Sequence, residues 1–197
     1  MKLCSVIDCN STVYAKELCK RHYYQVRKFG AVKRTKFDCQ IFEIHNGDCE
    51  ILLYNNRGEF VSKTVVDASD SSRVSGHKWH MLGSGYVQSS TAGRLNRYIL
   101  GCSDPNVFVD HIDRDKLNNR KSNLRVCTNS ENLYNMKSKR KYKGVYSSGG
   151  LWIAKIGVGC KRLYIGTFNT EAKAALAYNE AAIRHHGEFA RLNKIHD

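Results

Sequence analysis

Short hydrophobic runs separated by polar turn residues mark the chain from residue 38 to about 100, and this pattern favours short strands. In the clearest case, Ile51–Tyr54 and Phe60–Val66 stand on either side of a polar turn that contains glycine. Two such runs around a short turn predict a β-hairpin. A second hairpin is expected to join residues 78–81 to residues 85–88.

Three helices are predicted from signals at their ends. The basic aromatic segment 21–30 finishes in glycine, a common helix stop. Thr128 and Glu131 have the spacing of a capping box, so a helix is expected to begin there. The third helix is expected over about 170–185, with Thr170 as its N-cap. Three strands, at 143–146, 151–158 and 161–168, are predicted before that last helix.

These elements predict a small modular α+β protein. Its expected parts are a Cys-rich unit with a basic helix at 1–30, a basic linker at 31–37, a β-rich region at 38–100, a strand–loop–strand–helix segment at 101–136, a basic linker at 137–141, and a three-stranded antiparallel sheet with one helix at 142–197.

Positive charge is concentrated at the two ends of the chain. The formal net charge is +14 and the sequence pI is about 9.5. Residues 1–37 hold nine Lys/Arg against two Asp/Glu, residues 137–197 hold twelve against four, and the middle is nearly neutral. This charge favours a polyanionic partner, with nucleic acid first and an anionic membrane second. No apolar run approaches the roughly 20 residues that span a bilayer, so a membrane protein is not expected.

The eight cysteines are expected to be thiols or metal ligands, not disulfides. The first residues lack the apolar region of a signal peptide, which predicts a cytosolic protein. Five cysteines lack paired spacing, and most of them are expected to be buried small hydrophobes. They are Cys39, Cys49, Cys102, Cys127 and Cys160.

Four residues near the N-terminus have the spacing C-x4-C-x9-C-x2-H: Cys4, Cys9, Cys19 and His22. Zinc prefers four tetrahedral sulfur and nitrogen ligands, and so short a peptide could not otherwise bury a core. A structural Zn²⁺ is therefore predicted; the alternative is three scattered cysteines and a surface histidine. The segment 18–23 resembles the small zinc-binding elements that head some phage endonucleases. Three side chains of its helix are expected to contact DNA phosphates, namely Arg21, Arg27 and Lys28.

The candidate chemistry lies around Asp110 and His111, where a carboxylate stands beside an imidazole. Asn132, on the first turn of a predicted helix, offers another oxygen. A single Mg²⁺ or Mn²⁺ prefers oxygen ligands and keeps several waters, so Asp110 and Asn132 suffice to hold it. Neutral His111 can take a proton from the water that attacks a phosphodiester. Asn123 is a candidate to orient the ring.

The residues Asp110-His111, Asn123-Leu124-Arg125 and Asn132 resemble the motif of the HNH homing endonucleases. The resemblance implies a ββα-metal site in which His111 is the general base, Asp110 and Asn132 are metal ligands, and Asn123 is a structural brace. Relatives commonly have histidine where this chain has Asn96. A polar hairpin with a chance Asp-His pair and a degenerate, inactive nuclease fold are the alternatives.

The C-terminal segments 142–146, 151–156 and 161–168 resemble the APETALA/ethylene-response-factor DNA-binding domain. That resemblance implies a sheet that lies in the major groove of duplex DNA, with alternate strand residues facing the bases. Arg162 is the best candidate for base reading. Trp152 suits packing against the helix as well as it suits contact with DNA. The full set expected to face DNA is Lys143, Tyr146, Trp152, Lys155, Arg162 and Tyr164.

These expectations together favour a metal-dependent, site-recognising DNA endonuclease, which by resemblance is a homing enzyme. It would bind double-stranded DNA as a monomer or a DNA-induced dimer, in the bacterial host cytoplasm if a phage encodes it. Two alternatives stay open: a DNA-binding regulator on an inactive HNH scaffold, and an RNA-binding protein. The RNA-binding protein is disfavoured, because the major groove of RNA is too deep and narrow for a sheet to read.

Overall fold

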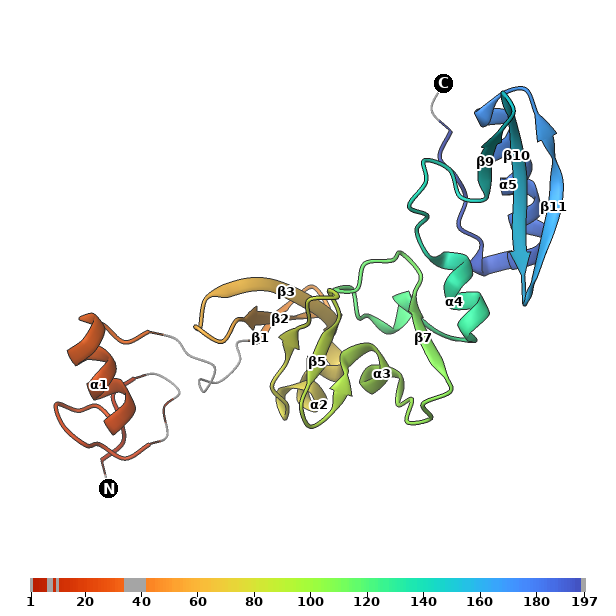
Figure 1. The fold of residues 1–197 in the computed structure, drawn as a ribbon. Coiled ribbons are helices and arrows are strands. Elements are labelled where there is room, and N and C mark those ends of the chain that lie inside the picture. Colours follow the sequence, from red (N-terminus) through yellow and green to blue (C-terminus); the bar gives the residue numbers. More distant parts are fainter. Residues whose placement is uncertain (1, 7–8, 10, 34–41, 196–197) are drawn as a thin grey trace. The chain divides into compact units, whose positions relative to one another are not determined.

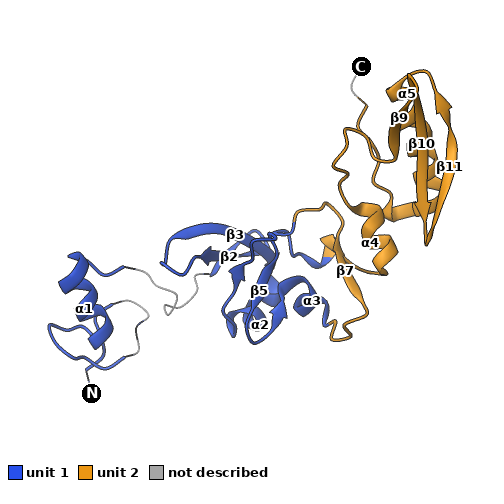
Figure 2. Ribbon diagram, viewed as in Figure 1, with its two compact units in different colours: residues 1–101, 116–121 blue, residues 102–115, 122–197 orange. Residues whose placement is uncertain are grey.

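A computed structural model describes residues 2–6, 9, 11–33 and 42–195 of the chain. Cys39 and most of the predicted linker at 31–37 lie outside the described residues. The chain divides into two compact units, residues 1–101 with 116–121 and residues 102–115 with 122–197 (Figure 2). The loop 116–121 belongs with the first unit, whereas the segments on either side of it belong with the second.

The first unit begins with a Cys-rich loop and the helix α1 (Lys20–Phe29). Gly30 ends the helix in the left-handed conformation (φ 73°), and its N–H donates to the carbonyl of Val26. The predicted helix and its glycine stop are therefore confirmed.

A three-stranded antiparallel sheet follows, in the order β1 (Phe42–His45), β2 (Asp48–Tyr54), β3 (Phe60–Asp67) (Figure 1). Alternate residues of β2 are fully buried, namely Cys49, Ile51 and Leu53. The first predicted hairpin is confirmed. Strand β1, most of whose residues are exposed, was not predicted.

The rest of the first unit mixes short strands and helices. After η1 (Ala68–Asp70) and α2 (Ser71–Ser75), a small sheet of β4 (His80–Met81), β5 (Val87–Ser89) and β6 (Gly93–Arg94) leads into α3 (Leu95–Leu100). The second hairpin is confirmed, since His80 pairs with Gln88. The three helical segments were not predicted; Leu95 and Ile99 of α3 are buried, and so is Asn96.

The loop 116–121 is fastened to β2 and β3. Val65 donates its N–H to the carbonyl of Leu117 at 2.8 Å, and Asn119 donates its own N–H to the carbonyl of Val65 at 2.7 Å. The guanidinium of Arg120 pairs with Asp48, which lowers the pKa of that carboxyl through the hydrogen bond. The loop thus adds backbone bonds to the edge of the first sheet.

The second unit starts with two short strands and a helix, as predicted. β7 (Phe108–His111) pairs antiparallel with β8 (Leu124–Cys127), which follows the 3-10 turn η2 (Lys121–Asn123). The helix α4 (Asn129–Asn135) opens with the complete capping box of Thr128 and Glu131. The hydrogen bond from the backbone of Thr128 holds the pKa of Glu131 below its usual value, so this carboxylate stays charged beside the helix N-terminus.

The C-terminal part is a three-stranded antiparallel sheet, β9 (Val145–Ser148), β10 (Leu151–Val158) and β11 (Lys161–Phe168), with β10 in the middle. The helix α5 (Glu171–His186) lies along one face of it (Figure 1). Small residues of α5 and the ring of Tyr178 pack on β10, where Ala154 and Ile156 are buried. The predicted N-cap is confirmed, because the hydroxyl of Thr170 accepts from the N–H of Lys173.

The helix α4 packs directly on this C-terminal part. The ring of Tyr134 stacks on that of His186, with centroids 3.7 Å apart and planes 7° apart, and the Tyr134 hydroxyl accepts from the N–H of Gly159 at 2.7 Å. The side chain of Lys143 donates to the carbonyls of Leu133 and Met136 at 3.1 and 3.0 Å. The strand–loop–strand–helix segment is therefore fixed to the C-terminal sheet, although the sequence placed a linker between them. Among the described helices, none has the length and apolar character that crossing a bilayer requires.

Candidate functional site

The carboxylate of Asp110 is held on β7 by two side chains from neighbouring elements. Arg125, its cross-strand partner on β8, donates from Nε and Nη2 to Oδ2 at 3.1 and 2.8 Å. Asn135, on α4, donates from Nδ2 to Oδ2 at 2.9 Å and to Oδ1 at 3.2 Å. Asp110 is only 7% exposed, so the position of its oxygens is set by these contacts.

His111 follows on the same strand and is also buried. Its backbone carbonyl accepts from Nδ2 of Asn135 at 2.9 Å and from the N–H of Arg114 at 2.9 Å. Asn123 braces the loop that comes next, because its Oδ1 accepts from the N–H of Asp113 at 3.0 Å and its Nδ2 donates to Oδ1 of Asp113 at 2.8 Å. The chain around the histidine is thereby held on both sides.

Sequence reasoning named Asn132 and missed Asn135. Asn132 is half-buried on the first turn of α4, and Asn135 lies three residues later, so both side chains occupy one face of the helix. Asn135 is the amide that contacts Asp110. This three-residue spacing from Asn132 was the signal that could have identified it. The assignment of Asn132 as a metal ligand stays a prediction.

The donors here fit a hard divalent cation. Mg²⁺ and Mn²⁺ prefer carboxylate and amide oxygens, which are the donors that Asp110 and Asn132 offer. The bond from Asn135 to Oδ1 of Asp110 is 3.2 Å long. A carboxylate oxygen has two lone pairs, so this bond leaves one of them for a cation. Asp110 and Asn132 stay the predicted ligands of such an ion.

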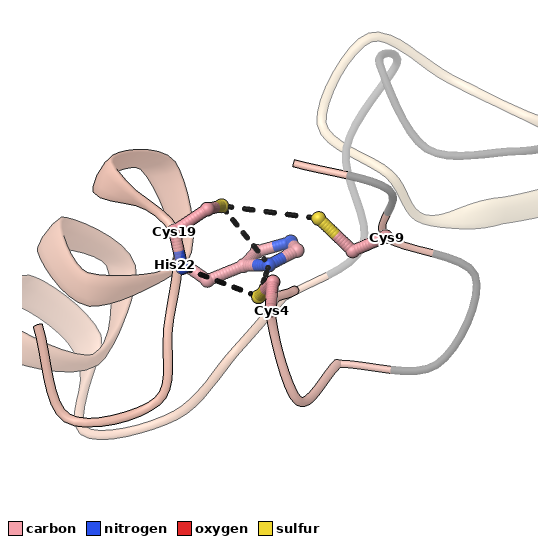
Figure 3. Close-up of side chains that lie close together, drawn as sticks. All are labelled: Cys4, Cys9, Cys19 and His22. Atoms are coloured by element: carbon pink, nitrogen blue, oxygen red, sulfur yellow. Dashed lines mark hydrogen bonds between the residues drawn. The ribbon is translucent and has the colours of Figure 1, made fainter. Parts of the chain in front are cut away.

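A second cluster, in the N-terminal loop and α1, joins Cys4, Cys9, Cys19 and His22 (Figure 3). Their ligand atoms all lie within 4.8 Å of one another, and His22 is 1% exposed. The separations are 3.9 Å between the sulfurs of Cys9 and Cys19, and 3.3 and 3.5 Å from Nδ1 of His22 to those of Cys4 and Cys19. A tetrahedral zinc site places two sulfurs about 3.8 Å apart and a sulfur and a nitrogen about 3.5 Å apart, given its bond lengths. The cluster can hold a metal ion with this geometry.

Backbone groups around the cluster favour thiolates. The N–H of Cys19 donates to the sulfur of Cys4 at 3.2 Å. A backbone hydrogen bond from Ser11 lowers the pKa of Cys9, whereas burial raises that of Cys19. Metal binding requires deprotonated sulfur, so these bonds assist it.

The outer face of the C-terminal sheet, opposite α5, carries most of the residues expected to contact DNA. Lys155 is the cross-strand partner of Tyr164, and Arg162 pairs two residues further along, beside Gly157. Tyr146 pairs with Ile153, which lies on the same face of β10 as Lys155 because side chains of a strand alternate. Tyr146, Lys155, Arg162 and Tyr164 thus share one surface, on which Arg162 and Tyr164 are exposed.

Two expected members of that face lie elsewhere. Trp152 packs against the core cluster under α5 with Ala154, which resolves the open choice in favour of packing. The ammonium of Lys143 bonds to carbonyls at the end of α4. Burial, and then the nearby Arg191 and Arg114, lower the pKa of Lys143 to about 8. The expectation that Lys143 faces DNA is therefore replaced by an intramolecular role.

A family model described as HNH endonuclease matches residues 97–134, which contain β7, β8 and most of α4. An uncharacterized HNH endonuclease, L560, of Acanthamoeba polyphaga mimivirus is 38% identical over 130 residues, which cover 62% of this chain and 70% of that protein. The chain belongs to the HNH endonuclease family.

The C-terminal region of this HNH protein is similar to plant transcription factors. The ethylene-responsive transcription factor ERF070 of Arabidopsis thaliana is 40% identical over 96 residues, or 44% of this chain and 60% of that protein. The ethylene-responsive transcription factor WRI1 of the same plant is 47% identical over 57 residues, or 27% of this chain and 13% of that protein. The suspected combination of an HNH segment with a factor-like domain is therefore confirmed, and the chain spans only part of these plant relatives.

The remaining candidate residues of the HNH protein are on α1 and among the cysteines outside the zinc cluster. Arg27 and Lys28 are exposed, whereas Arg21 is half-buried with its guanidinium 2.9 Å from Nε2 of His22. Of the described cysteines outside the cluster, Cys49 and Cys127 are buried as expected, and burial raises the pKa of Cys127 to about 11. Cys102 is half-buried and Cys160 is exposed, so two of these four cysteines are buried.

Proposed function

We propose that this HNH protein is a metal-dependent endonuclease that cuts double-stranded DNA at recognised sites. The observation that supports it best is the adjacent pair Asp110 and His111 on β7, held by Arg125 and Asn135 against α4. A buried carboxylate and imidazole at consecutive positions supply a cation ligand and a proton acceptor.

In the proposed reaction His111, in its neutral form, takes a proton from a water molecule, whose oxygen forms a bond to phosphorus while the bond to the 3′ oxygen breaks. Asp110 and Asn132 hold one Mg²⁺ or Mn²⁺. When bound, the ion polarises the phosphate and stabilises the charge on the leaving oxygen. Asn123 keeps the loop after His111 in place through Asp113.

The flanking parts are proposed to hold the DNA. The sheet face with Lys155, Arg162 and Tyr164 would lie in the major groove, where Arg162 reads a base edge. Arg21, Arg27 and Lys28 of α1 would contact phosphates beside a Zn²⁺ site that gives the N-terminal segment its fold. Phosphate contacts position the protein, whereas the sheet supplies the sequence preference.

We also propose a role as a homing enzyme of phage or intron origin that acts in the cytoplasm of a bacterial host. With one nuclease site per chain, a monomer would nick one strand, and cutting both would require a DNA-induced dimer or two successive events.

The test is cleavage of long duplex DNA of diverse sequence with Mg²⁺ or Mn²⁺. His111→Ala and Asp110→Ala should each lower the rate by about 10²–10⁴. The matched control is His185→Ala, which removes an exposed histidine of α5 and should leave the rate unchanged. Cleavage that persists in the His111→Ala variant would contradict the mechanism.

A DNA-binding regulator on an inactive HNH scaffold is the second candidate. The ion pair of Asp110 with Arg125 favours it, because this carboxylate has a structural partner already. Site-specific binding without cleavage under any divalent ion would support the regulator over the endonuclease.

A further inference from the structure

A cleft of about 430 Å³ in the second unit is lined by cationic side chains from three separate segments. One comes from the loop after β7, others from residues 137–143 and the rest from the tail after α5. Apart from Lys143 they are Arg114, Lys137, Arg140, Lys141, Arg191 and Lys194. The described lining contains no Asp or Glu.

The tail that carries Arg191 and Lys194 is fastened by Asn193. Its Oδ1 accepts from the N–H of Lys143 at 2.7 Å, and its Nδ2 donates to the Lys143 carbonyl at 3.1 Å. Its backbone is tied to α5 as well, since its N–H donates to Oδ1 of Asn179 at 2.7 Å and its carbonyl accepts from Nδ2 of Asn179 at 3.0 Å. The cationic groups on either side of Asn193 are thus attached to a fixed backbone, and ordering them costs less when a ligand binds.

The cations of the cleft are close enough to disfavour one another's charge. Burial and then Arg114 lower the pKa of Arg191, and burial, then Arg191 and Arg114 lower the pKa of Lys143. Among the described acids, Glu171 is the one that pairs with a lining residue, through Lys141 at 3.1 Å. A bound anion would relieve this repulsion.

The position of the cleft relates it to both proposed DNA contacts. Arg114 stands three residues after His111, whose carbonyl accepts its N–H. On the other side, the guanidinium of Arg140 lies 4.7 Å from the ring centroid of Tyr146, on the outer face of the sheet. The cleft therefore lies between the loop of the candidate nuclease site and the sheet face, all within one compact unit.

We propose that this cleft binds a backbone phosphate of the DNA duplex. This phosphate lies between the stretch of DNA at His111 and the stretch of DNA that the sheet reads. The proposal rests on the proposed function, because it takes DNA as the source of the phosphate. Arg191, Lys194 and Arg114 are the groups that contact the phosphate oxygens. Their role is to position the duplex, not to read its sequence.

The experiment measures affinity for a duplex over a salt series in the His111→Ala background, so that no DNA is consumed. Each phosphate contact contributes about 0.9 to the slope of log K against log salt concentration. Because Arg191 and Lys194 are assigned to one phosphate, the double variant Arg191→Gln/Lys194→Gln should lower the slope by about 0.9. The control, Lys173→Gln/Arg184→Gln, makes the same charge change at exposed positions of α5 and should leave the slope nearly unchanged.

Equal slopes for the cleft and control variants would overturn the proposal, provided that both unfold at the wild-type temperature. Titration with inorganic phosphate and a nucleoside triphosphate separates the sources. The proposal fails if these compounds bind the wild type tightly and the cleft variant weakly while the two proteins have the same affinity for DNA. The cleft would then be a site for a free phosphate compound. The slope change stands whether or not the protein cleaves DNA, so this inference and the nuclease proposal can fail separately.

Discussion

The guanidinium of Arg125 lies against the carboxylate of Asp110, with Nη2 2.8 Å from Oδ2. The same guanidinium donates from Nη1 to the carbonyl of Glu188 at 2.8 Å and lies 3.9 Å from the centroid of the Phe189 ring. One side chain therefore joins the candidate metal ligand to the 3-10 turn η3 (Gly187–Phe189) that follows α5. Arg125 therefore couples the position of β7 to that of the C-terminal domain.

Removing that guanidinium should destabilise the second unit. Arg125→Ala leaves the Asp110 carboxylate buried without its cation, which typically costs about 3–5 kcal/mol in the free energy of unfolding. Urea unfolding measures this cost. Arg184→Ala, an exposed arginine of α5, is the control and should change stability by less than about 0.5 kcal/mol. An Arg125→Ala loss no larger than that of the control would show that the pair contributes nothing.

Lys143 predicts a pH dependence of stability. Its pKa in the folded protein is about 8, below the ordinary lysine value of 10.5, so the unfolded chain binds more protons between these pH values. The contribution of Lys143 to the free energy of unfolding therefore rises as pH increases from about 8 to 10.5. Wild type should gain stability over this window relative to Lys143→Met, measured by urea unfolding at several pH values. A difference that is constant with pH would contradict the shift.

Metal removal should unfold the N-terminal segment, residues 1–30, and leave the rest of the protein folded. Cys9→Ser, or a chelator, should release one zinc ion per chain and make residues 1–30 sensitive to protease, because binding supplies most of the folding free energy of so short a segment. Metal analysis and limited proteolysis are the measurements. Cys160→Ser removes an exposed cysteine outside the cluster and should retain the metal. Protection of residues 1–30 after complete chelation would refute the assignment.

Two glycines with the same backbone conformation should respond differently to alanine. Gly144 (φ +76°) and Gly150 (φ +78°) are both left-handed. A Cβ on Gly144 would stand 2.5 Å from the Lys155 carbonyl oxygen and closer still to the Tyr178 ring, whereas Gly150 has open space. Gly150→Ala should cost about 1–2 kcal/mol for the conformation alone, and Gly144→Ala several kcal/mol more. Similar thermal stabilities for the two variants would disprove this steric difference.

Arg162 and Trp152 should separate recognition from stability. Arg162→Ala removes an exposed cation from the outer face and should reduce discrimination between target sites by about 1–3 kcal/mol with no loss of stability. Trp152→Ala removes a ring from the cluster under α5 and should cost about 3 kcal/mol in stability. Competition binding and thermal unfolding distinguish the effects. Equal loss of specificity in both variants would place Trp152 at the DNA after all.

Local patterns in the sequence determined much of this protein. The spacing of Cys4, Cys9, Cys19 and His22, the capping box at Thr128 and the hairpin around residues 55–58 all depend on residues close together in the chain. Their energies come from backbone hydrogen bonds, turns and ligand geometry, which short segments specify by themselves. The strand–loop–strand–helix order around Asp110 was predictable for the same reason.

Tertiary structure decided the rest, because it depends on partners far away in the chain. Asn135 reaches Asp110 from 25 residues away, and Arg125 reaches Glu188 from 63. Lys143 donates to a carbonyl at the end of α4, and this bond depends on the packing of α4 against the C-terminal part. Residue types in a strand indicate which side chains share a face, but the element that covers a face determines whether a lysine meets solvent, DNA or the end of a helix. That choice is made by packing, which no local pattern encodes.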